Sequence, residues 1–514
     1  MARGSRHSKG KKKRANAGIA KKGKSETKLH FEDPKKLNEA SAGKQDYDSE
    51  FYDMFHRVKH NWSCYTIDLF NDVFSNVNNP GNYSLCFVTG TQTENPTEAD
   101  MRKHKRKEPS TVAMHVASKL KETRNDDNPE LAEENPTDAT IKSVDILTGI
   151  GDVHRVRAHP VEPVLAAVYE SLDGRQEFLQ VCSVAAQMAE LENFIAGTER
   201  EDARTVTFPL PCPLTYALRF SPKGKYLALA GEDNAVHVYE INSSDPNAPL
   251  AVELTRPVPL NIEGWAYNAL DITWLNDGIF LVSTNAPSGG RPTVCLVSLT
   301  HNAEGNLQGD VVSRVVVEDE ADLNAISVKK YTDDDGKDVT KFVTGGDSGH
   351  VYCYEVDHKT WQIAQAPCDK SAYCAQQNPP LEITSIAYSP ATAVPIQDEE
   401  DDEFKTAFAV ATRLGPVHSN QPTTSEMAKV AYFDFDLLKD LDDEEPEEDG
   451  APKEFFFAHN AQKEFSEICW DRNVANLLLA TGVEGTDFLR VHTAGEEEMV
   501  QMEVDGEEGD DVEM

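Results

Sequence analysis

The feature that most constrains the fold is a series of short apolar runs separated by turn residues, between Leu214 and Ile241. The first run ends at Phe220, the second covers Tyr226 to Ala230, and the third covers Val236 to Ile241. Patterns of period two bounded by Pro, Gly, Asp and Asn are typical of antiparallel strands joined by tight hairpins. One such unit cannot bury both of its faces, so further copies must stack beside it.

Degenerate copies of this unit recur along the chain. Runs of five to seven residues, interrupted this often, argue against helices. Repeats of about 40–45 residues that stack side by side predict an all-β, seven-bladed β-propeller in which the two chain ends share a blade. An ordinary β-sandwich is the alternative. The other copies begin at Trp62, Val156, Leu270, Leu323, Ile383 and Phe465.

Composition narrows the class of protein. The 514 residues carry a formal net charge of −38. No apolar run approaches the roughly 20 residues that span a bilayer, and the N-terminus lacks the apolar segment of a secretory signal. The nine cysteines lie mostly inside expected strands, which favours buried thiols in a reducing compartment over a disulfide framework.

The N-terminal 24 residues hold ten Lys or Arg and no acidic residue. The cluster Lys11, Lys12, Lys13 and Arg14 predicts a nuclear address or a nucleic-acid-binding arm; a basic tail that only adds solubility is the alternative. The expected parts are a disordered basic tail over 1–45, an N-terminal α-helix over 46–60, a propeller over 61–494 with acidic loop insertions, and a disordered acidic tail over 495–514.

Residues 46–60 have apolar side chains at helical spacing. Phe51, Met54 and Phe55 would lie on one side of such a helix, with acids near its start and bases near its end. The helix would pack its apolar stripe on the propeller, and in the functional interpretation it would also form one wall of a groove for a partner.

Acidic residues gather in four segments: residues 126–134, residues 398–403, residues 442–449 and the tail from residue 496. Each segment lies between the first and second or the third and fourth strand of a copy, or follows a third strand. Because direction alternates in an antiparallel meander, all four are expected at one face of the ring. Such a face would attract a basic polypeptide and repel nucleic acid. The residues expected to bind the partner are Asp398, Glu399, Glu400, Asp401, Asp402, Glu403, Asp442, Asp443, Glu444, Glu445, Glu447, Glu448 and Asp449.

Residue patterns for catalysis and cofactor binding are weak. Gly346-Asp347-Ser348-Gly349 resembles a serine-protease nucleophile segment, but it falls where each copy has its second turn. His154 and His159 are five residues apart, but no Cys or carboxylate completes a metal set with them, and Cys368 and Cys374 lack zinc-site spacing. We therefore predict a protein that is not an enzyme and needs no cofactor or metal.

The copies resemble WD repeats in which Tyr239-Glu240, Tyr354-Glu355 and Phe435-Asp436 stand at the Trp-Asp position. Seven short segments further resemble the glutamate-rich WD-repeat ribosome-assembly proteins, a family similar to the retinoblastoma-binding histone chaperones: residues 56–57, 62–68, 88–92, 322–327, 455–459, 467–470 and 485–490. The resemblance implies a WD40-type propeller that chaperones the basic large-subunit ribosomal protein L-three. It also implies a role in early 60S assembly on pre-ribosomal particles, in the nucleus and nucleolus.

The sequence thus predicts a monomeric, non-enzymatic chaperone of a basic ribosomal protein. Phe51, Met54 and Phe55 would give apolar contacts and the acidic segments charge, and nucleic acid would contact only the N-terminal arm. A histone-binding chaperone in chromatin assembly is the alternative, and a substrate receptor of a ubiquitin ligase is a third class.

Overall fold

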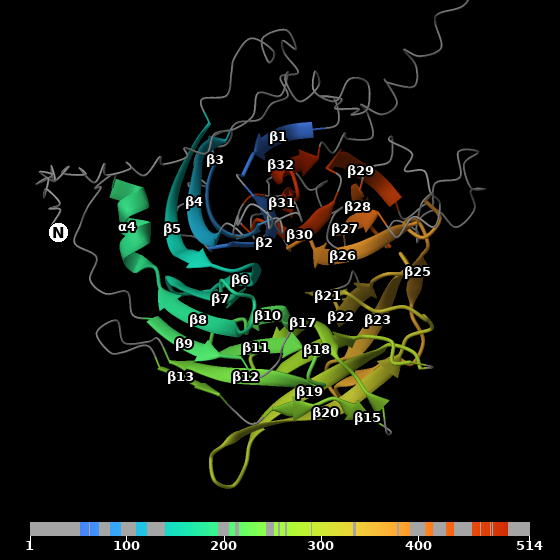
Figure 1. Ribbon diagram of the computed structural model, residues 1–514. Coiled ribbons are helices and arrows are strands. Elements are labelled where there is room, and N and C mark those ends of the chain that lie inside the picture. Colours follow the sequence, from blue (N-terminus) through green and yellow to red (C-terminus); the bar gives the residue numbers. More distant parts are fainter. Residues whose placement is uncertain are drawn as a thin grey trace, which may run out of the picture.

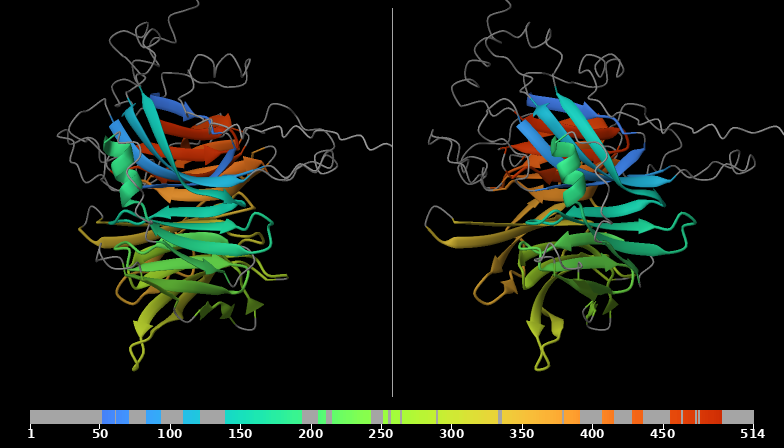
Figure 2. Two further views of the ribbon diagram at one scale, coloured as in Figure 1. Left: turned by 60° about the vertical axis from the view of Figure 1, so that its left-hand side comes forward. Right: turned by 90° about the vertical axis from the view of Figure 1, so that its left-hand side faces the viewer.

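The computed structural model describes residues 52–60, 62–70, 83–93, 109–120, 139–193, 205–210, 215–242, 251–254, 257–262, 265–288, 290–332, 336–377, 380–390, 407–414, 428–435, 455–462, 464–472, 474 and 476–491. Antiparallel sheets radiate from a central axis and close into a ring (Figure 1). Views from the side of the ring show that each sheet is narrow and twisted (Figure 2). The protein is a seven-bladed WD40-type β-propeller, as its repeats predict.

Blades 1 to 4 follow one another along the chain, and each begins with its innermost strand. Their strands are β2 (Ser63–Leu69), β3 (Tyr83–Gln92), β4 (Ser110–Leu120) and β5 (Thr140–Ile150); β6 (Val153–Ala158), β7 (Val164–Glu170), β8 (Glu177–Ser183) and β9 (Thr205–Pro209); β10 (Thr215–Phe220), β11 (Tyr226–Gly231), β12 (Ala235–Asn242), β13 (Ala251–Leu254) and β14 (Val258–Pro259); and β17 (Ala269–Asn276), β18 (Ile279–Thr284), β19 (Thr293–His301) and β20 (Leu307–Val316).

Blades 5 and 6 repeat the arrangement, and blade 7 takes its outer strand from the start of the chain. Their strands are β21 (Ala325–Thr332), β22 (Asp338–Gly345), β23 (Val351–Asp357), β24 (Gln362–Ile363) and β25 (Asp369–Ser371); β26 (Leu381–Tyr388), β27 (Phe408–Leu414), β28 (Ala428–Phe433) and β29 (Phe455–Gln462); and β30 (Phe465–Trp470), β31 (Leu477–Gly482), β32 (Gly485–Val491) and β1 (Tyr52–Val58). The hairpin of β15 (Asn261–Ile262) and β16 (Trp265–Ala266) lies between blades 3 and 4, and α4 (Ala185–Asn193) follows β8.

The expected helix over residues 46–60 is wrong where the structure describes it, because residues 52–58 form strand β1. This strand pairs antiparallel with β32, so the two chain ends do share a blade. The register shifts between Tyr52 and Met54, and this bulge puts Tyr52 and Phe55 on the side of blade 6. Met54 and Val58 face blade 1. The bulge therefore produces an i, i+3 spacing that imitates a helix.

The core consists of seven apolar clusters in the described residues, and each fills the gap between two adjacent blades. Each sheet is covered on both faces by its neighbours, so its strands read as continuous apolar runs. All six residues of β11 are buried, for example. Helix α4 adds Met188 and Leu191 to the cluster between blades 1 and 2.

The cysteines that the structure describes are free thiols, and most are buried, as the sequence predicts. Burial raises the pKa of the Cys86, Cys182 and Cys295 thiols to about 12. Among the described residues, no helix has the length and apolar character needed to cross a membrane.

Candidate functional site

The alternation of strand direction gives the ring two faces with different connections. The first-to-second and third-to-fourth connections of each blade lie at one face, which we call the insertion face. The second-to-third connections and the links to the next blade lie at the other, which we call the rim face. The acidic segments 126–134, 398–403 and 442–449 fall between β4 and β5, β26 and β27, and β28 and β29. The flanking strand ends thus share the insertion face, but the segments lie outside the described residues, so their role stays a prediction.

The rim face carries acidic residues on blades 2, 3, 5, 6 and 7 and on the links that lead into them. Each lies within two residues of the end of a second strand, at the start of a third, or within three residues of the start of an innermost strand. Strand ends and short turns on a packed ring hold side chains more rigidly than long loops do. We call this set the acidic rim: Asp152, Glu170, Glu177, Glu232, Asp322, Asp347, Glu382 and Glu464.

One arc of the acidic rim is centred on Arg413, near the end of β27. Its Nε donates to Glu382 at 2.5 Å, and its Nη2 lies 3.7 Å from Asp347. The charge of Glu464 also acts on Arg413. Tyr65, next along the ring, is half-buried beside Glu464 and Asp152, and burial and these two acids raise its pKa.

The opposite arc surrounds Tyr216, which lies at the bulge of β10. Its hydroxyl donates to Glu232 at 2.6 Å. Burial, that hydrogen bond and the charges of Glu232, Asp322 and Glu177 hold the pKa of the phenol well above its usual range. Asp322 accepts a 2.7 Å hydrogen bond from the backbone N–H of Ala286.

Neighbouring carboxylates on the rim repel one another. Burial and the nearby Glu382 raise the pKa of Glu464, although Arg413 opposes the shift. Burial and the charge of Asp347 likewise raise the pKa of Asp322. A cation bound between such groups would relieve this repulsion. The rim therefore concentrates negative charge at one end of the ring.

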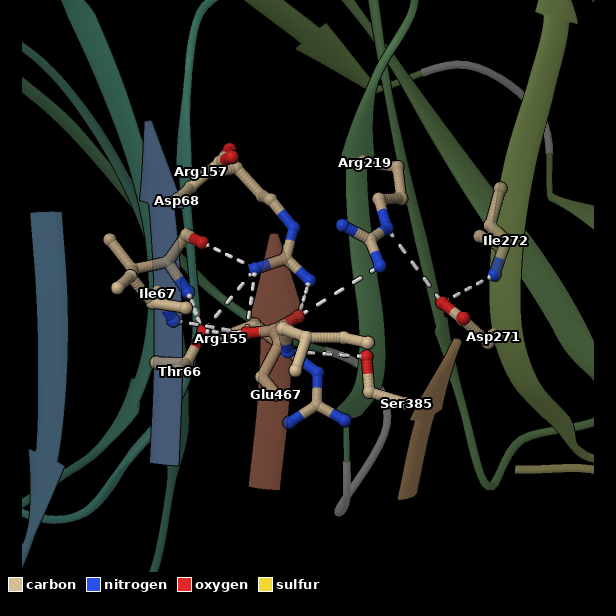
Figure 3. A network of polar contacts seen from close by, with 12 residues as sticks. Thr66, Ile67, Asp68, Arg155, Arg157, Arg219, Asp271, Ile272, Ser385 and Glu467 are labelled. Atoms are coloured by element: carbon tan, nitrogen blue, oxygen red, sulfur yellow. Dashed lines mark hydrogen bonds and ion pairs between the residues drawn. The ribbon is translucent and has the colours of Figure 1, made fainter. Parts of the chain in front are cut away.

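Below the rim, a buried ionic network lines the axis of the ring (Figure 3). Arg157 donates to both carboxylate oxygens of Glu467, one of them at 3.1 Å. Arg219 lies 3.8 Å from Glu467 and 3.8 Å from Asp271. Burial opposes the ionisation of Glu467, but Arg157, Arg155 and Arg219 outweigh it and lower its pKa to about 2. Glu467 is therefore a fixed anion at neutral pH.

Hydrogen bonds at the level of this ionic network also connect the innermost strands of adjacent blades. A side chain on one innermost strand accepts a hydrogen bond from a backbone N–H of the next. Thr66 accepts from Val156 at 3.1 Å, Asp271 from Ile326 at 3.1 Å, and Ser385 from Ile468 at 3.4 Å. Glu467 accepts from Ile67 at 3.1 Å across the closure from blade 7 to blade 1. The network thus holds the ring together, which is a structural role.

The residues expected to bind the partner divide into two groups. Met54 and Phe55 are 0% and 3% exposed and pack between blades, so they do not form an open apolar wall. Their burial agrees with the expectation that this apolar stripe packs on the propeller, and their assignment to a partner groove stays a prediction. Phe51, residues 398–403, residues 442–449 and the basic cluster from Lys11 to Arg14 lie outside the described residues.

Motif residues singled out in the sequence take structural roles. Gly346, Asp347, Ser348 and Gly349 form the turn between β22 and β23, with Gly349 at a φ of 74°, as turn chemistry predicts. Ser348 donates to Asp319 at 2.5 Å. The residues Arg57, His459 and Asp487, which carry the family resemblance, form a buried cluster at the closure: Asp487 accepts from Arg57 Nε at 2.5 Å and contacts His459 at 3.3 Å.

Sequence reasoning missed the acidic rim and two groups that could hold a metal ion. The expectation that His154 lacks carboxylate partners is wrong, since Glu170 and Glu177 lie against it. Cys353, Cys368 and Asp369 form the second group. Only the position of each acid relative to its strand could have revealed the rim, because its members lie more than 300 residues apart at the extremes.

Comparison with known proteins gives a similarity over a short stretch of the chain. No protein-family model matches the chain. A stretch of 77 residues is 31% identical to one subunit of chromatin assembly factor 1 from Gallus gallus, which is 13% of this chain and 14% of the relative. The chain therefore matches only a small part of that protein. Together with the WD40-type fold, this similarity favours a role in protein–protein interaction.

Proposed function

We propose that this protein is a non-enzymatic chaperone that binds a basic protein client through the acidic rim. The observation that supports it best is the rim itself, in which carboxylates from five different blades surround one end of the ring axis. A basic polypeptide crossing this end would meet several carboxylates in succession. Electrostatic attraction would speed the encounter and set its orientation.

Two aromatic side chains give the rim places for individual cationic groups. Tyr65 lies beside Glu464 and Asp152, and Tyr216 lies beside Glu232. An aromatic ring next to a carboxylate suits a lysine or arginine, because the ring contacts its aliphatic part or its cationic face. These two arcs are the proposed anchor points for the client.

The acidic segments at residues 398–403 and 442–449 also contribute to the proposed binding of the client. They flank strand ends of the insertion face, opposite the rim. We assign them attraction of the basic client segments that come within about a Debye length of them, roughly 8 Å at physiological salt, and competition with RNA for those segments.

For the identity of the client, we propose a basic ribosomal protein of the large subunit, handled in the nucleus or nucleolus during early 60S assembly. The family resemblance and the basic cluster from Lys11 to Arg14 support this choice. Histones are the second candidate, favoured by the similarity to part of a chromatin assembly factor. Mass spectrometry of proteins that copurify with the tagged chain separates the two: ribosomal proteins with nucleolar factors, or core histones.

The decisive experiment neutralises part of the rim without removing its hydrogen-bond acceptors. In the triple variant Glu232→Gln, Asp322→Asn and Asp347→Asn, each amide oxygen can still accept the bond that the carboxylate accepts from Tyr216, Ala286 or Asn324. A control variant, Glu162→Gln, Asp277→Asn and Glu304→Gln, makes the same change in net charge at the insertion face.

Binding of the purified ribosomal client is measured by titration at 0.15 M salt. Three charge contacts at the protein surface, at about 0.5 kcal/mol each, predict about tenfold weaker binding for the rim variant. The control should bind like the wild type. Equal affinity of the two variants would reject the rim as the docking surface. Deleting residues 442–449 should mainly slow association.

A further inference from the structure

A second feature of the rim face is a histidine held between two glutamates on blade 2. His154 lies at the bulge of β6, Glu170 is the last residue of β7, and Glu177 is the first residue of β8. Glu170 and Glu177 are register partners. The three side chains therefore come from three adjacent strands of one rigid sheet, which is a suitable scaffold for a fixed ligand set.

Two separations within this group match those between ligands of one small cation, and all three ligand atoms lie within 4.8 Å of one another. His154 Nε2 lies 3.3 Å from Glu170 Oε1 and 3.6 Å from Glu177 Oε1. Ligands at the zinc bond lengths of about 2.0–2.2 Å in a tetrahedron lie about 3.3–3.6 Å apart. A charge-assisted hydrogen bond would be shorter, about 2.7–2.9 Å. The His154–Glu170 contact at 3.3 Å is also a long hydrogen bond, whereas the 3.6 Å separation between His154 and Glu177 exceeds hydrogen-bond range and fits a shared metal.

Glu177 gives a second, independent indication. Its side chain is 4% exposed, and Oε1, which faces His154, is buried with no hydrogen-bond partner among the described residues. A buried carboxylate oxygen without a hydrogen bond is costly. The other oxygen, Oε2, accepts a 2.9 Å hydrogen bond from Thr215, which orients the carboxylate and leaves Oε1 directed at the group.

We propose that His154, Glu170 and Glu177 bind one divalent transition-metal ion, with zinc as the expected occupant. One imidazole nitrogen and two carboxylate oxygens form a borderline donor set that favours zinc over magnesium or calcium. The metal would link β6, β7 and β8 and neutralise two carboxylates of the rim. All three proposed ligands lie on blade 2, and the metal site does not depend on the identity of the proposed client.

The test uses the tag-free full chain, freed of metal by a chelator that is then removed. Cobalt(II) is titrated and followed by its visible absorption, and zinc is titrated by calorimetry. The variants are His154→Asn and Glu177→Gln. The control is His237→Asn in blade 3, because His237 contacts the single carboxylate of Asp233 at 2.5 Å. Melting curves without metal verify that each variant folds.

The wild type and the control should take up one tight equivalent, with the visible band of four-coordinate cobalt, and zinc should raise their melting temperature. His154→Asn and Glu177→Gln should lose the equivalent, the band and the shift. Thr215→Val should weaken binding about 10- to 100-fold, as expected for the loss of an orienting hydrogen bond. Absence of tight uptake by the wild type, or uptake that both variants retain, would overturn the proposal. Should His154→Asn fail to fold, Glu177→Gln decides alone.

Discussion

Replacement of Asp487 by asparagine is predicted to open the closing blade. The Asp487 carboxylate is 0% exposed and accepts from Arg57 Nε at 2.5 Å and Nη2 at 2.7 Å, while Arg57 is 3% exposed. Burial opposes the charge on Asp487, but Arg57 holds its pKa well below the usual range. The carboxylate is therefore ionised in the folded protein at neutral pH.

The expected loss follows from leaving the Arg57 charge buried without this carboxylate. Breaking a buried pair from one side costs about 3–5 kcal/mol, a large part of the roughly 5–15 kcal/mol that stabilises a typical protein. Glu484, 3.9 Å from Arg57 and 39% exposed, compensates only in part. Because the pair joins β1 to β32, the loss should be concentrated at the closure.

The assay combines thermal melting with amide hydrogen exchange. In Asp487→Asn, exchange should rise first in β1 and β32, and the melting temperature should fall. The control Glu382→Gln changes a partner of the half-exposed Arg413 and should cost less than about 1 kcal/mol. The double variant Arg57→Met, Asp487→Leu should be less destabilised than the sum of its single variants. Unchanged exchange in β1, or additive single effects, would refute the reasoning.

Other variants test the remaining structural features. Glu467→Gln removes the anion shared by Arg157 and Arg219 and should cost about 3–5 kcal/mol in urea unfolding, and a change below about 1 kcal/mol would contradict the role of the network in holding the ring. Met54→Ala should cost about 2–5 kcal/mol if Met54 is core, whereas a solvent-facing Met54 would change stability little. Burial lowers the pKa of His115 well below 6.5, so the unfolded chain binds more protons as the pH falls below 6.5. Stability should therefore fall from pH 7 to pH 5, by up to about 1.4 kcal/mol per pH unit for one such histidine. His115→Asn should reduce the pH dependence of the unfolding free energy measured in urea. An unchanged pH dependence would show that His115 does not cause it.

The repeats can be predicted from sequence because their signals are local. Each blade carries its own strand alternation and turn residues, such as Ser221 to Gly224 and Gly346 to Gly349, and both sets form turns as expected. The repeats also predict the ring closure, but the strand that makes it has the apolar spacing of a helix. The bulge between Tyr52 and Met54 gives this single strand its i, i+3 spacing, and only pairing with β32 resolves the ambiguity.

The candidate site is less accessible to sequence reasoning because its members come from distant blades. Asp152 and Glu464 act on the same tyrosine, Tyr65, although 312 residues separate them. Dense acidic runs are easily recognised in a sequence, whereas single acidic residues next to innermost strands are not. His154, Glu170 and Glu177 likewise come together only through the register of β6, β7 and β8.

The central claim is that the acidic rim is where a basic client binds. Zero-length carbodiimide coupling joins lysines to carboxylates in direct contact, and peptide mass spectrometry then identifies both partners. With the copurifying client bound at physiological salt, coupling should reach Glu232, Asp322 and Asp347, and it should disappear in 0.5 M salt, where screening falls to about 4–5 Å. Coupling confined to carboxylates of the insertion face, such as Asp277 and Glu304, would contradict the claim.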